Sequence, residues 1–248
     1  IDASGDAEVV DSISGLTNLG NKGVVQTPTM IFKMANVNIP EFLHIDPAEI
    51  DQKVADADRS GAYNLPRHHV YIFPLPNSGE VLCNMTRITY PDGSIPMGTS
   101  STDLTYAEIE GRKQAREYAR FLVDRLPAFQ HAYLSDTGTQ IGIRQTRSIV
   151  GESILRNDDI IQARKNKNAV TFSAWPIESH GSQGVKIVYV ENDHYDIPFE
   201  TLIPRHSINL LVAGPCMSPE HEAFASATVT AQCFAIRYAV GAASSLIQ

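Results

Sequence analysis

Both ends of the chain carry one pattern, in which a short apolar run is followed by a glycine turn and then by a helix. At the start, residues 1–10 (IDASGDAEVV) combine the end of a strand, a turn at Gly5 and Asp6, and a helix start whose amides can donate to Asp6. At the other end, residues 209–247 combine a strand, Gly214, a loop of small and polar residues, and a long helix rich in alanine. Such units bring bare backbone close to a ligand at the carboxyl end of a strand, as in α/β sheets that bind nucleotides.

Each unit alone has a plainer explanation, because a sharp turn needs no ligand and an alanine-rich helix can simply be a tightly packed core helix. The chain between the two units is different, because it is rich in hairpins. The sequence therefore predicts an α/β nucleotide-binding fold interrupted by a mixed, sheet-rich insertion. The expected elements are strands at 27–37, 132–143, 185–190 and 208–213, a hairpin at 70–89, a helix at 47–60 capped by Asp46, a helix at 105–126 with Ile109 on its apolar face, a turn at 164–168, a loop at 179–184, and one last helix running to about residue 246.

Composition argues against several classes of protein. The chain has 248 residues and a formal net charge of −8, whereas a nucleic-acid binder needs clustered Lys and Arg. The basic cluster at 164–167 is typical of a solvated loop. No apolar run approaches the about 20 residues that span a bilayer. Three scattered cysteines without a C-x-x-C pair indicate neither a disulfide framework nor a zinc site, and they fit a reducing compartment such as the cytoplasm.

A third motif, GIRQTRSIVGE at residues 142–152, places Arg144 and Arg147 three residues apart on a turn or helix start. Two guanidinium groups at this spacing can share an anion or a carbonyl-bearing substrate. They can equally form structural salt bridges with the plentiful acidic side chains. The motif alone leaves both interpretations open.

Taken together, these motifs resemble one protein family. Residues 2–8 read DASGDAE, residues 142–153 read GIRQTRSIVGES, and residues 197–244 begin IPFETLIPRHSINLLVAGPCMSPEHEAF. They are similar to the DATGDAD, GIRETRRIVGEY and IPYRSLIPRGVDNLLVAGRCISATHEAL phrases of a family of FAD-dependent oxidoreductases. The likeness runs in order through nearly the whole chain.

The resemblance implies an α/β, FAD-binding Rossmann-like (glutathione-reductase-like) fold, of which this chain is the C-terminal part, with an inserted α+β substrate domain. It implies FAD-binding segments at 1–25 and 196–248 and a substrate domain mainly at 26–195. Family members open with a G-x-G-x-x-G unit that this sequence lacks. We therefore expect an N-terminal FAD-binding chain that carries G-x-G-x-x-G and buries Ile1, and a higher oligomer of that two-chain unit. The alternatives are a cleaved precursor and a fragment.

Two positions depart from the family's pattern, because Pro215 and Thr228 stand where the family has arginine. Both lie in the segment that the resemblance puts near the flavin. Losing two cations there should weaken the stabilisation of an anionic reduced flavin or an anionic substrate. The substrate or the chemistry is therefore expected to differ from that of typical members.

Flavin oxidoreduction needs a hydride acceptor and usually a base for the substrate proton. His221, with Glu222 beside it, is the first candidate for that base, because an imidazole titrates near neutral pH; a helix cap is the structural alternative. His180 is the second candidate. The expected contacts of FAD are Gly5, Asp6, Arg144, Gly214, Pro215, Cys216 and Ser226, those of the substrate are Arg147 and Trp175, and no metal site is expected.

The sequence thus predicts an FAD-dependent oxidoreductase that acts on a small organic substrate by hydride transfer to flavin N5. A two-chain dehydrogenase that passes electrons to another protein is the alternative among enzymes. The competing class is a non-catalytic or assembly subunit that has lost the family's two arginines. In either case, this chain alone should bind FAD weakly, because its sheet would lack strands.

Overall fold

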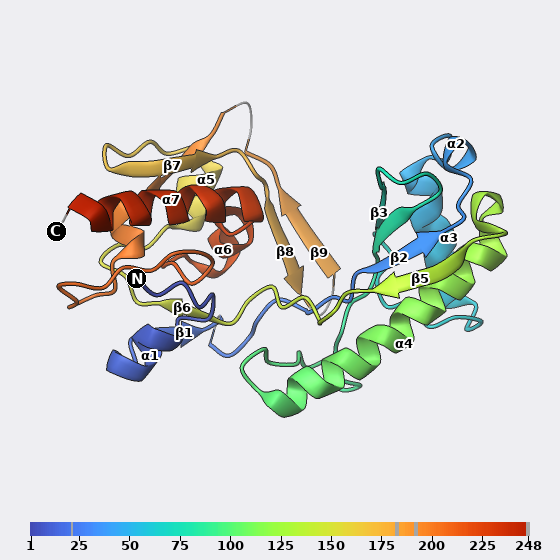
Figure 1. Cartoon of the computed structure of the whole chain (residues 1–248), viewed down its shortest axis with the longest axis horizontal. Coiled ribbons are helices and arrows are strands. Elements are labelled where there is room, and N and C mark those ends of the chain that lie inside the picture. Colours follow the sequence, from blue (N-terminus) through green and yellow to red (C-terminus); the bar gives the residue numbers. More distant parts are fainter. Residues whose placement is uncertain (21, 182–183, 191–192, 247–248) are drawn as a thin grey trace. The chain divides into compact units, whose positions relative to one another are not determined.

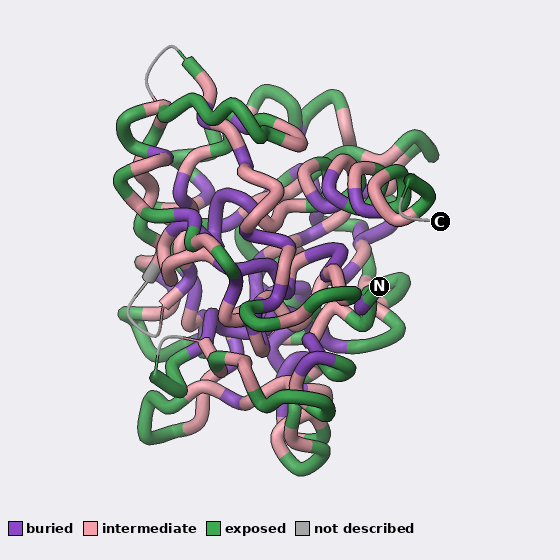
Figure 2. The backbone as a smooth tube through the Cα atoms, turned by 90° about the vertical axis from the view of Figure 1, so that its left-hand side faces the viewer, coloured by how far each residue is buried: buried purple, intermediate pink, exposed green. Residues whose placement is uncertain are grey.

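The computed structural model describes residues 1–20, 22–181, 184–190 and 193–246 and divides into two compact units, coloured along the chain in Figure 1. Unit 1 comprises residues 1–26 and 145–248, and unit 2 comprises residues 27–144. Each unit has its own buried core, drawn in purple in Figure 2. Residues 145–195, expected mainly in the inserted domain, cluster with the two ends of the chain because their strands pair within unit 1.

Unit 2 is built on a four-stranded antiparallel sheet in the order β3-β4-β2-β5. The predicted hairpin is confirmed, because Ile72 pairs with Cys83 across β3 and β4. Along β2, Phe32 and Met34 are buried while Lys33 between them is half-buried, which is the two-residue period of a strand with one covered face. The elements of unit 2 are β2 (Phe32–Ala35), α2 (Ile39–Phe42), α3 (Pro47–Arg59), β3 (Tyr71–Pro74), β4 (Val81–Asn84), α4 (Ser101–Arg125), the 3-10 helix η1 (Pro127–Phe129) and β5 (Tyr133–Thr137).

Both long helices of unit 2 begin at a side-chain cap. Asp46 Oδ1 accepts a hydrogen bond from the backbone amide of Ala48 at 2.9 Å, which confirms the predicted start of α3. Ser100 Oγ accepts from the amide of Asp103 at 3.3 Å, so α4 begins several residues earlier than predicted. Pro127 follows the end of α4, as expected.

The buried face of α4 differs from the predicted face in one residue. Ala107, Gly111, Ala115 and Tyr118 follow one another at helical spacing and are all buried. Ile109 lies off this stripe and its side chain is 54% exposed, so its assignment to the apolar face was wrong.

We expect Gly111→Ala to destabilise unit 2, although alanine normally stabilises a helix relative to glycine. A Cβ at Gly111 would lie 2.8 Å from Met30 Cβ and 3.1 Å from Ile141 Cδ1, which is too close for the packed sheet to accept without a shift. Overpacking of this kind costs about 1–3 kcal/mol. Gly241→Ala on α7 is the matched control, because nothing lies within 4 Å of its Cβ position. It should stabilise by up to about 1 kcal/mol. Denaturant unfolding of both variants checks the opposite signs.

The described part of unit 1 combines three antiparallel strand pairs with four α-helices and one 3-10 helix. β1 pairs with β6, β7 with β10, and β8 with β9, while α6 packs against β8 and α7 packs against β7. The elements are α1 (Glu8–Ser14), β1 (Thr17–Leu19), β6 (Arg147–Ile149), α5 (Asn157–Ile161), β7 (Ala169–Ser173), β8 (Ile177–Gly181), β9 (Gly184–Val188), β10 (Tyr195–Pro198), the 3-10 helix η2 (Phe199–Leu202), α6 (His221–Ala227) and α7 (Thr230–Leu246).

Several predicted elements of this chain need correction. The loop expected at 179–184 is wrong for its described residues, because they belong to the hairpin of β8 and β9; residues 182–183 lie outside the described chain. The single last helix is two helices, α6 and α7, broken at the β-branched run 228–230, which disfavours a helix. The strands expected at 132–143 and 208–213 shorten to β5 and to one bridge, because only Val212 of the second finds a paired neighbour.

Candidate functional site

The two ends of the chain meet at one parallel bridge between Asp2 and Val212. The amide of Asp2 donates to Leu211 O at 2.8 Å, and the amide of Ala213 donates to Asp2 O at 2.8 Å. Because the two paired segments run parallel, they end on the same side, at one edge, and the turns that follow them lie next to each other. The turn and the helix predicted at the start of the chain are present, while the expected strand end is this single bridge. We call this edge, with Gly5 and Gly214, the glycine edge.

Each turn of the glycine edge contains a glycine that its backbone requires. Gly5 has φ +88° and Gly214 has φ +117°, in the region that side chains with a Cβ rarely adopt. A Cβ on Gly5 would meet no atom within 4 Å, so there is open space beside this turn. Gly214 is buried, and its Cβ position faces a side chain of α7. Close approach to backbone is thus open at the Gly5 turn, whereas the Gly214 position lies under that side chain.

Asp2 holds the first turn together. Its carboxylate is fully buried and accepts hydrogen bonds from the amide and hydroxyl of Ser4, at 3.0 and 2.6 Å, and from the amides of Val9 and Val10, at 3.0 and 3.1 Å. Burial alone would raise the pKa of Asp2, but the bonds from Ser4, Val10 and Val9 hold it below its ordinary value. Asp2 is therefore the charged cap of α1.

This role corrects the expectation for Asp6. We expected Asp6 to accept from the amides of the helix start, but its carboxylate accepts from the hydroxyl of Thr146 instead. Ala7, the residue before the helix, has φ +53° and supplies no side-chain cap. The sequence does carry a signal for Asp2, because an aspartate followed two residues later by serine is typical of a turn in which the carboxylate accepts from that residue's amide.

The loop that follows the second turn is held by hydrogen bonds to two other segments of the chain. Cys216 O accepts from the amide of Ile149 at 2.9 Å, and Glu220 Oε2 accepts from the amide of Asn157 at 2.8 Å. Asn157 Oδ1 in turn accepts from the amide of Ala223 at 2.8 Å, which caps α6 from α5. Burial raises the pKa of Cys216 to about 11, so this thiol stays protonated and is a poor nucleophile at neutral pH.

His221 opens α6 with an unsatisfied ring nitrogen. Its buried Nδ1 has no hydrogen-bond partner among the described residues. Burial lowers the pKa of His221, while the neighbouring charge of Glu222 raises it by a smaller amount. Glu222 forms an ion pair with Lys186 of β9 at 2.6 Å, so the predicted catalytic carboxylate has a structural partner. His221 is therefore a neutral imidazole at neutral pH.

His180, the second predicted base, lies buried in β8. Its Nε2 is 3.1 Å from Glu178 Oε1, and its backbone amide donates to Gln26 Oε1 at 3.3 Å. Gln145 Oε1 accepts from the amide of Gln26 at 3.2 Å, so both segments where the chain crosses between units are tied to β8. Sequence reasoning missed these two buried glutamines, since nothing in their spacing distinguishes them from surface residues.

The two arginines of the central motif fall in different units. Arg144 ends unit 2, whereas Arg147 begins β6 in unit 1. Arg147 forms ion pairs with Glu8 at 2.7 Å and with Asp11 at 3.3 Å, which join β6 to α1. These bonds favour the structural interpretation of Arg147. The predicted contacts of Arg144 with the cofactor and of Arg147 with the substrate stay predictions.

Trp175 has an anchored backbone and a largely exposed ring. Its amide donates to Ser173 Oγ at 3.0 Å, and its carbonyl oxygen accepts from Ser226 Oγ at 2.6 Å. Ser226 is fully buried and also shares a 2.6 Å hydrogen bond with the Tyr195 hydroxyl. Ser226, predicted to contact FAD, thus positions Trp175 in this structure.

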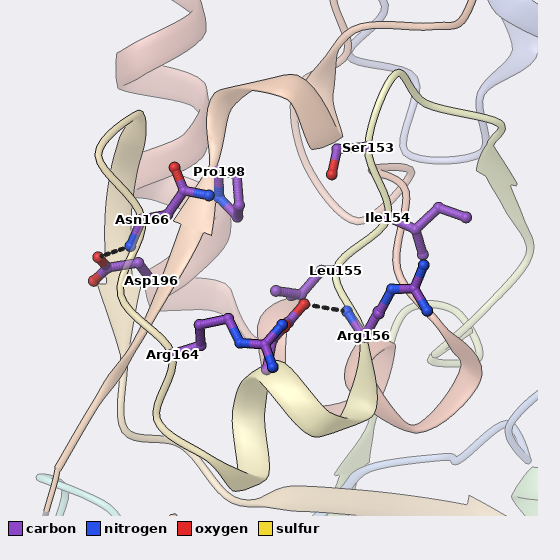
Figure 3. Close-up of a pocket in the computed structure, with 9 residues that line it drawn as sticks. Ser153, Ile154, Leu155, Arg156, Arg164, Asn166, Asp196 and Pro198 are labelled. Atoms are coloured by element: carbon purple, nitrogen blue, oxygen red, sulfur yellow. Dashed lines mark hydrogen bonds and ion pairs between the residues drawn. The ribbon is translucent and has the colours of Figure 1, made fainter.

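A separate cavity of about 210 Å³ lies elsewhere in unit 1 (Figure 3). It contains none of the predicted site residues, and its charges are balanced, with Arg164 paired to Asp159 at 2.8 Å. Its volume is below the about 300–1,000 Å³ of sites for drug-sized ligands. It is lined by Ser153, Ile154, Leu155, Arg156, Asp159, Arg164, Asn166, Asp196 and Pro198.

Three further findings concern the described residues. Among the described residues, no group of three or more His, Cys, Asp or Glu side chains is arranged to hold a metal ion. All three cysteines are free thiols. Within the described chain, no helix has both the length and the apolar character needed to cross a membrane.

Paired glycine turns at the carboxyl end of parallel segments are the kind of edge at which α/β proteins bind nucleotide cofactors. The chain belongs to the FAD dependent oxidoreductase family, whose sequence profile matches residues 1–248. Its cofactor is accordingly FAD. No curated protein and no solved structure matches the chain.

The residues of the glycine edge fit this cofactor. The open space beside Gly5 can admit a bulky ligand close to the backbone of the first turn. His221 Nδ1 is a buried polar atom that lacks a partner among the described residues, and a bound ligand could supply one. Both features are compatible with a bound FAD.

We expect Gly5→Ala to weaken FAD binding more than Gly15→Ala does. Both glycines have positive φ, +88° and +63°, and neither would place a Cβ within 4 Å of another atom, so both substitutions strain the backbone by about 1–2 kcal/mol. Only Gly5 belongs to the glycine edge, since Gly15 ends α1. Comparison of FAD dissociation constants, with thermal stability measured in parallel, separates cofactor contact from strain. Equal losses of affinity would contradict a cofactor role for Gly5.

Proposed function

We propose that the protein oxidises a small organic substrate by hydride transfer to bound FAD at the glycine edge. The observation that carries the proposal is the parallel pairing of Asp2 with Val212, which joins the turns of Gly5 and Gly214 in a member of the FAD dependent oxidoreductase family. The backbone of these turns would hold the cofactor, with Pro215 and Cys216 lining the same loop.

FAD, when bound, supplies the hydride acceptor at its N5. The proton that the substrate must also lose goes to His221 Nδ1, which is neutral at neutral pH and lacks a competing hydrogen bond among the described residues. Glu222 stabilises the imidazolium that results, and Lys186 fixes Glu222. The exposed ring of Trp175, held by Ser226, would cover the substrate.

We further propose that the fold is the C-terminal part of a Rossmann-like, glutathione-reductase-like FAD domain. A segment with G-x-G-x-x-G, on a partner chain or on the same polypeptide, would add strands beside the Asp2 bridge. The Ile1 side chain is 57% exposed beside that bridge, and Phe234 and Tyr238 of α7 are also exposed, so apolar surface is available for such a segment. We also propose that this unit forms a higher oligomer and that the protein is located in the reducing cytoplasm.

The native protein, purified with any partner, tests the function directly. We expect a stoichiometric flavin spectrum, and loss of the oxidised flavin absorbance when a suitable small organic substrate is added without oxygen. Bound FAD that chemical reductants reduce but that no substrate reduces would favour the non-catalytic subunit. A native protein without flavin would contradict the cofactor site itself.

A further inference from the structure

The glycine edge carries little positive charge of its own. Pro215 and Thr228 are uncharged, and Thr228 Oγ1 is engaged with Phe224 O at 2.7 Å at the end of α6. Arg147 is neutralised by two carboxylates of α1. Asp2 adds a buried negative charge behind the first turn. An anionic ligand at this edge therefore needs a cation from another element.

Arg237 of α7 reaches the edge from outside the loop. A Cβ built on Gly214 would lie 3.3 Å from Arg237 Nη2, 3.6 Å from Nε and 3.8 Å from Cζ, so the guanidinium group covers the glycine. The same group acts on Cys233, one helical turn earlier, whose pKa burial raises and the Arg237 charge lowers. The distances to the Gly214 Cβ position thus place this charge at the second turn.

The helix that carries Arg237 is fixed by packing, and among the described residues the guanidinium is not neutralised. Arg237 is an exposed residue on a helix anchored by the buried side chains of Cys233, Ile236 and Val240. Within the described part of the chain, no carboxylate forms an ion pair with it. A planar guanidinium with five donors, lying beside the Gly214 turn, is suited to bind anionic oxygens that approach that turn.

We propose that Arg237 binds an anionic oxygen of FAD at the Gly214 turn, and so supplies from α7 the cation that the loop lacks. This role rests on the proposed function. The oxygen belongs either to the pyrophosphate or to the N1–C2=O edge of the reduced flavin. Both groups can accept hydrogen bonds from a guanidinium. They differ in the property of the bound cofactor that Arg237 would affect. A pyrophosphate contact contributes to the binding of oxidised FAD, whereas a flavin contact stabilises the reduced form selectively.

The test uses the FAD-loaded native protein with Arg237→Met, Arg237→Lys and the control Arg205→Met. Arg205 is also exposed in unit 1, and its substitution changes the net charge equally. Three quantities are measured: the dissociation constant of oxidised FAD, the midpoint potential, and the affinity for sulfite, which adds to flavin N5 and leaves negative charge at N1. One charge-assisted hydrogen bond corresponds to roughly a 10–100-fold effect.

A pyrophosphate contact predicts that Arg237→Met weakens the binding of oxidised FAD, and of ADP as a competitor, by about tenfold or more with an unchanged potential. A flavin contact predicts that sulfite affinity falls by about tenfold and the potential by about 30 mV, with oxidised FAD bound as before. In either case Arg237→Lys should recover part of the effect. If Arg237→Met matches Arg205→Met in all three quantities while wild type binds FAD, the proposal is wrong and the proposed function stands. Wild type that binds no FAD overturns both.

Discussion

Replacing His221 with alanine should slow the substrate-dependent reduction of bound FAD by about 10²–10⁴-fold, the contribution typical of a positioned general base. The FAD content of the variant should stay within about twofold of wild type, because His221 handles the proton and does not anchor the cofactor. Single-turnover mixing with substrate, followed by the flavin absorbance, measures the rate. His206→Asn is a suitable control, since His206 is exposed and has a positive φ that asparagine tolerates.

The pH dependence of the same reaction distinguishes a base from a helix cap. Burial holds the pKa of His221 below 6.5, and the base is active only when neutral, so the rate should be constant at neutral pH and fall as the pH drops through that lowered value. Glu222 opposes the effect of burial. Glu222→Gln should therefore lower the pKa of His221 further and move the acid limb of the profile to lower pH. A limb that does not move in Glu222→Gln would count against His221 as the titrating base.

The sequence predicted the parts of the fold that depend on local signals. The cap at Asp46, the hairpin around Asn77–Gly79 and the end of α4 before Pro127 each follow from residues within a few positions of one another. The β8–β9 hairpin was missed because Ser179 and Gly181 have the composition of a loop, and only pairing with β9 makes them a strand. Strand formation at such positions is decided by a neighbour, which sequence pattern does not reveal.

The candidate site was predicted in its backbone but less well in its side chains. The turns at Gly5 and Gly214 follow from glycine chemistry, and the bridge between Asp2 and Val212 brings them to one edge. By contrast, Ser226 and Arg147 hold other protein groups, because their partners come from segments distant in the sequence. Arg237 escaped notice for the same reason, since its relation to Gly214 exists only once α7 is packed.

Replacing Asp2 with alanine should destabilise unit 1 by about 2–4 kcal/mol, since it removes a fully buried charge that accepts four hydrogen bonds. Both amides of the helix start, on Val9 and Val10, would lose their acceptor, and the turn that presents Gly5 would lose its support. In this variant the affinity for FAD should fall together with the free energy of unfolding. Denaturant unfolding followed by far-UV circular dichroism measures the free energy of unfolding.

Asp6→Ala is the matched control, because among the described residues the Asp6 carboxylate accepts one hydrogen bond, from the Thr146 hydroxyl. This substitution should lower the free energy of unfolding by about 1 kcal/mol. The aspartate whose replacement lowers that free energy more is the cap of α1. The pH dependence gives a second measurement. The folded-state pKa of Asp2 lies below 3.8, so its stabilisation is complete well above that value and is lost as the pH falls through the lowered pKa. Wild type should therefore lose stability more steeply than Asp2→Ala below about pH 4, by up to about 1.4 kcal/mol per pH unit for one proton. Parallel pH curves for the two proteins would show that Asp2 is not the charged cap of this turn.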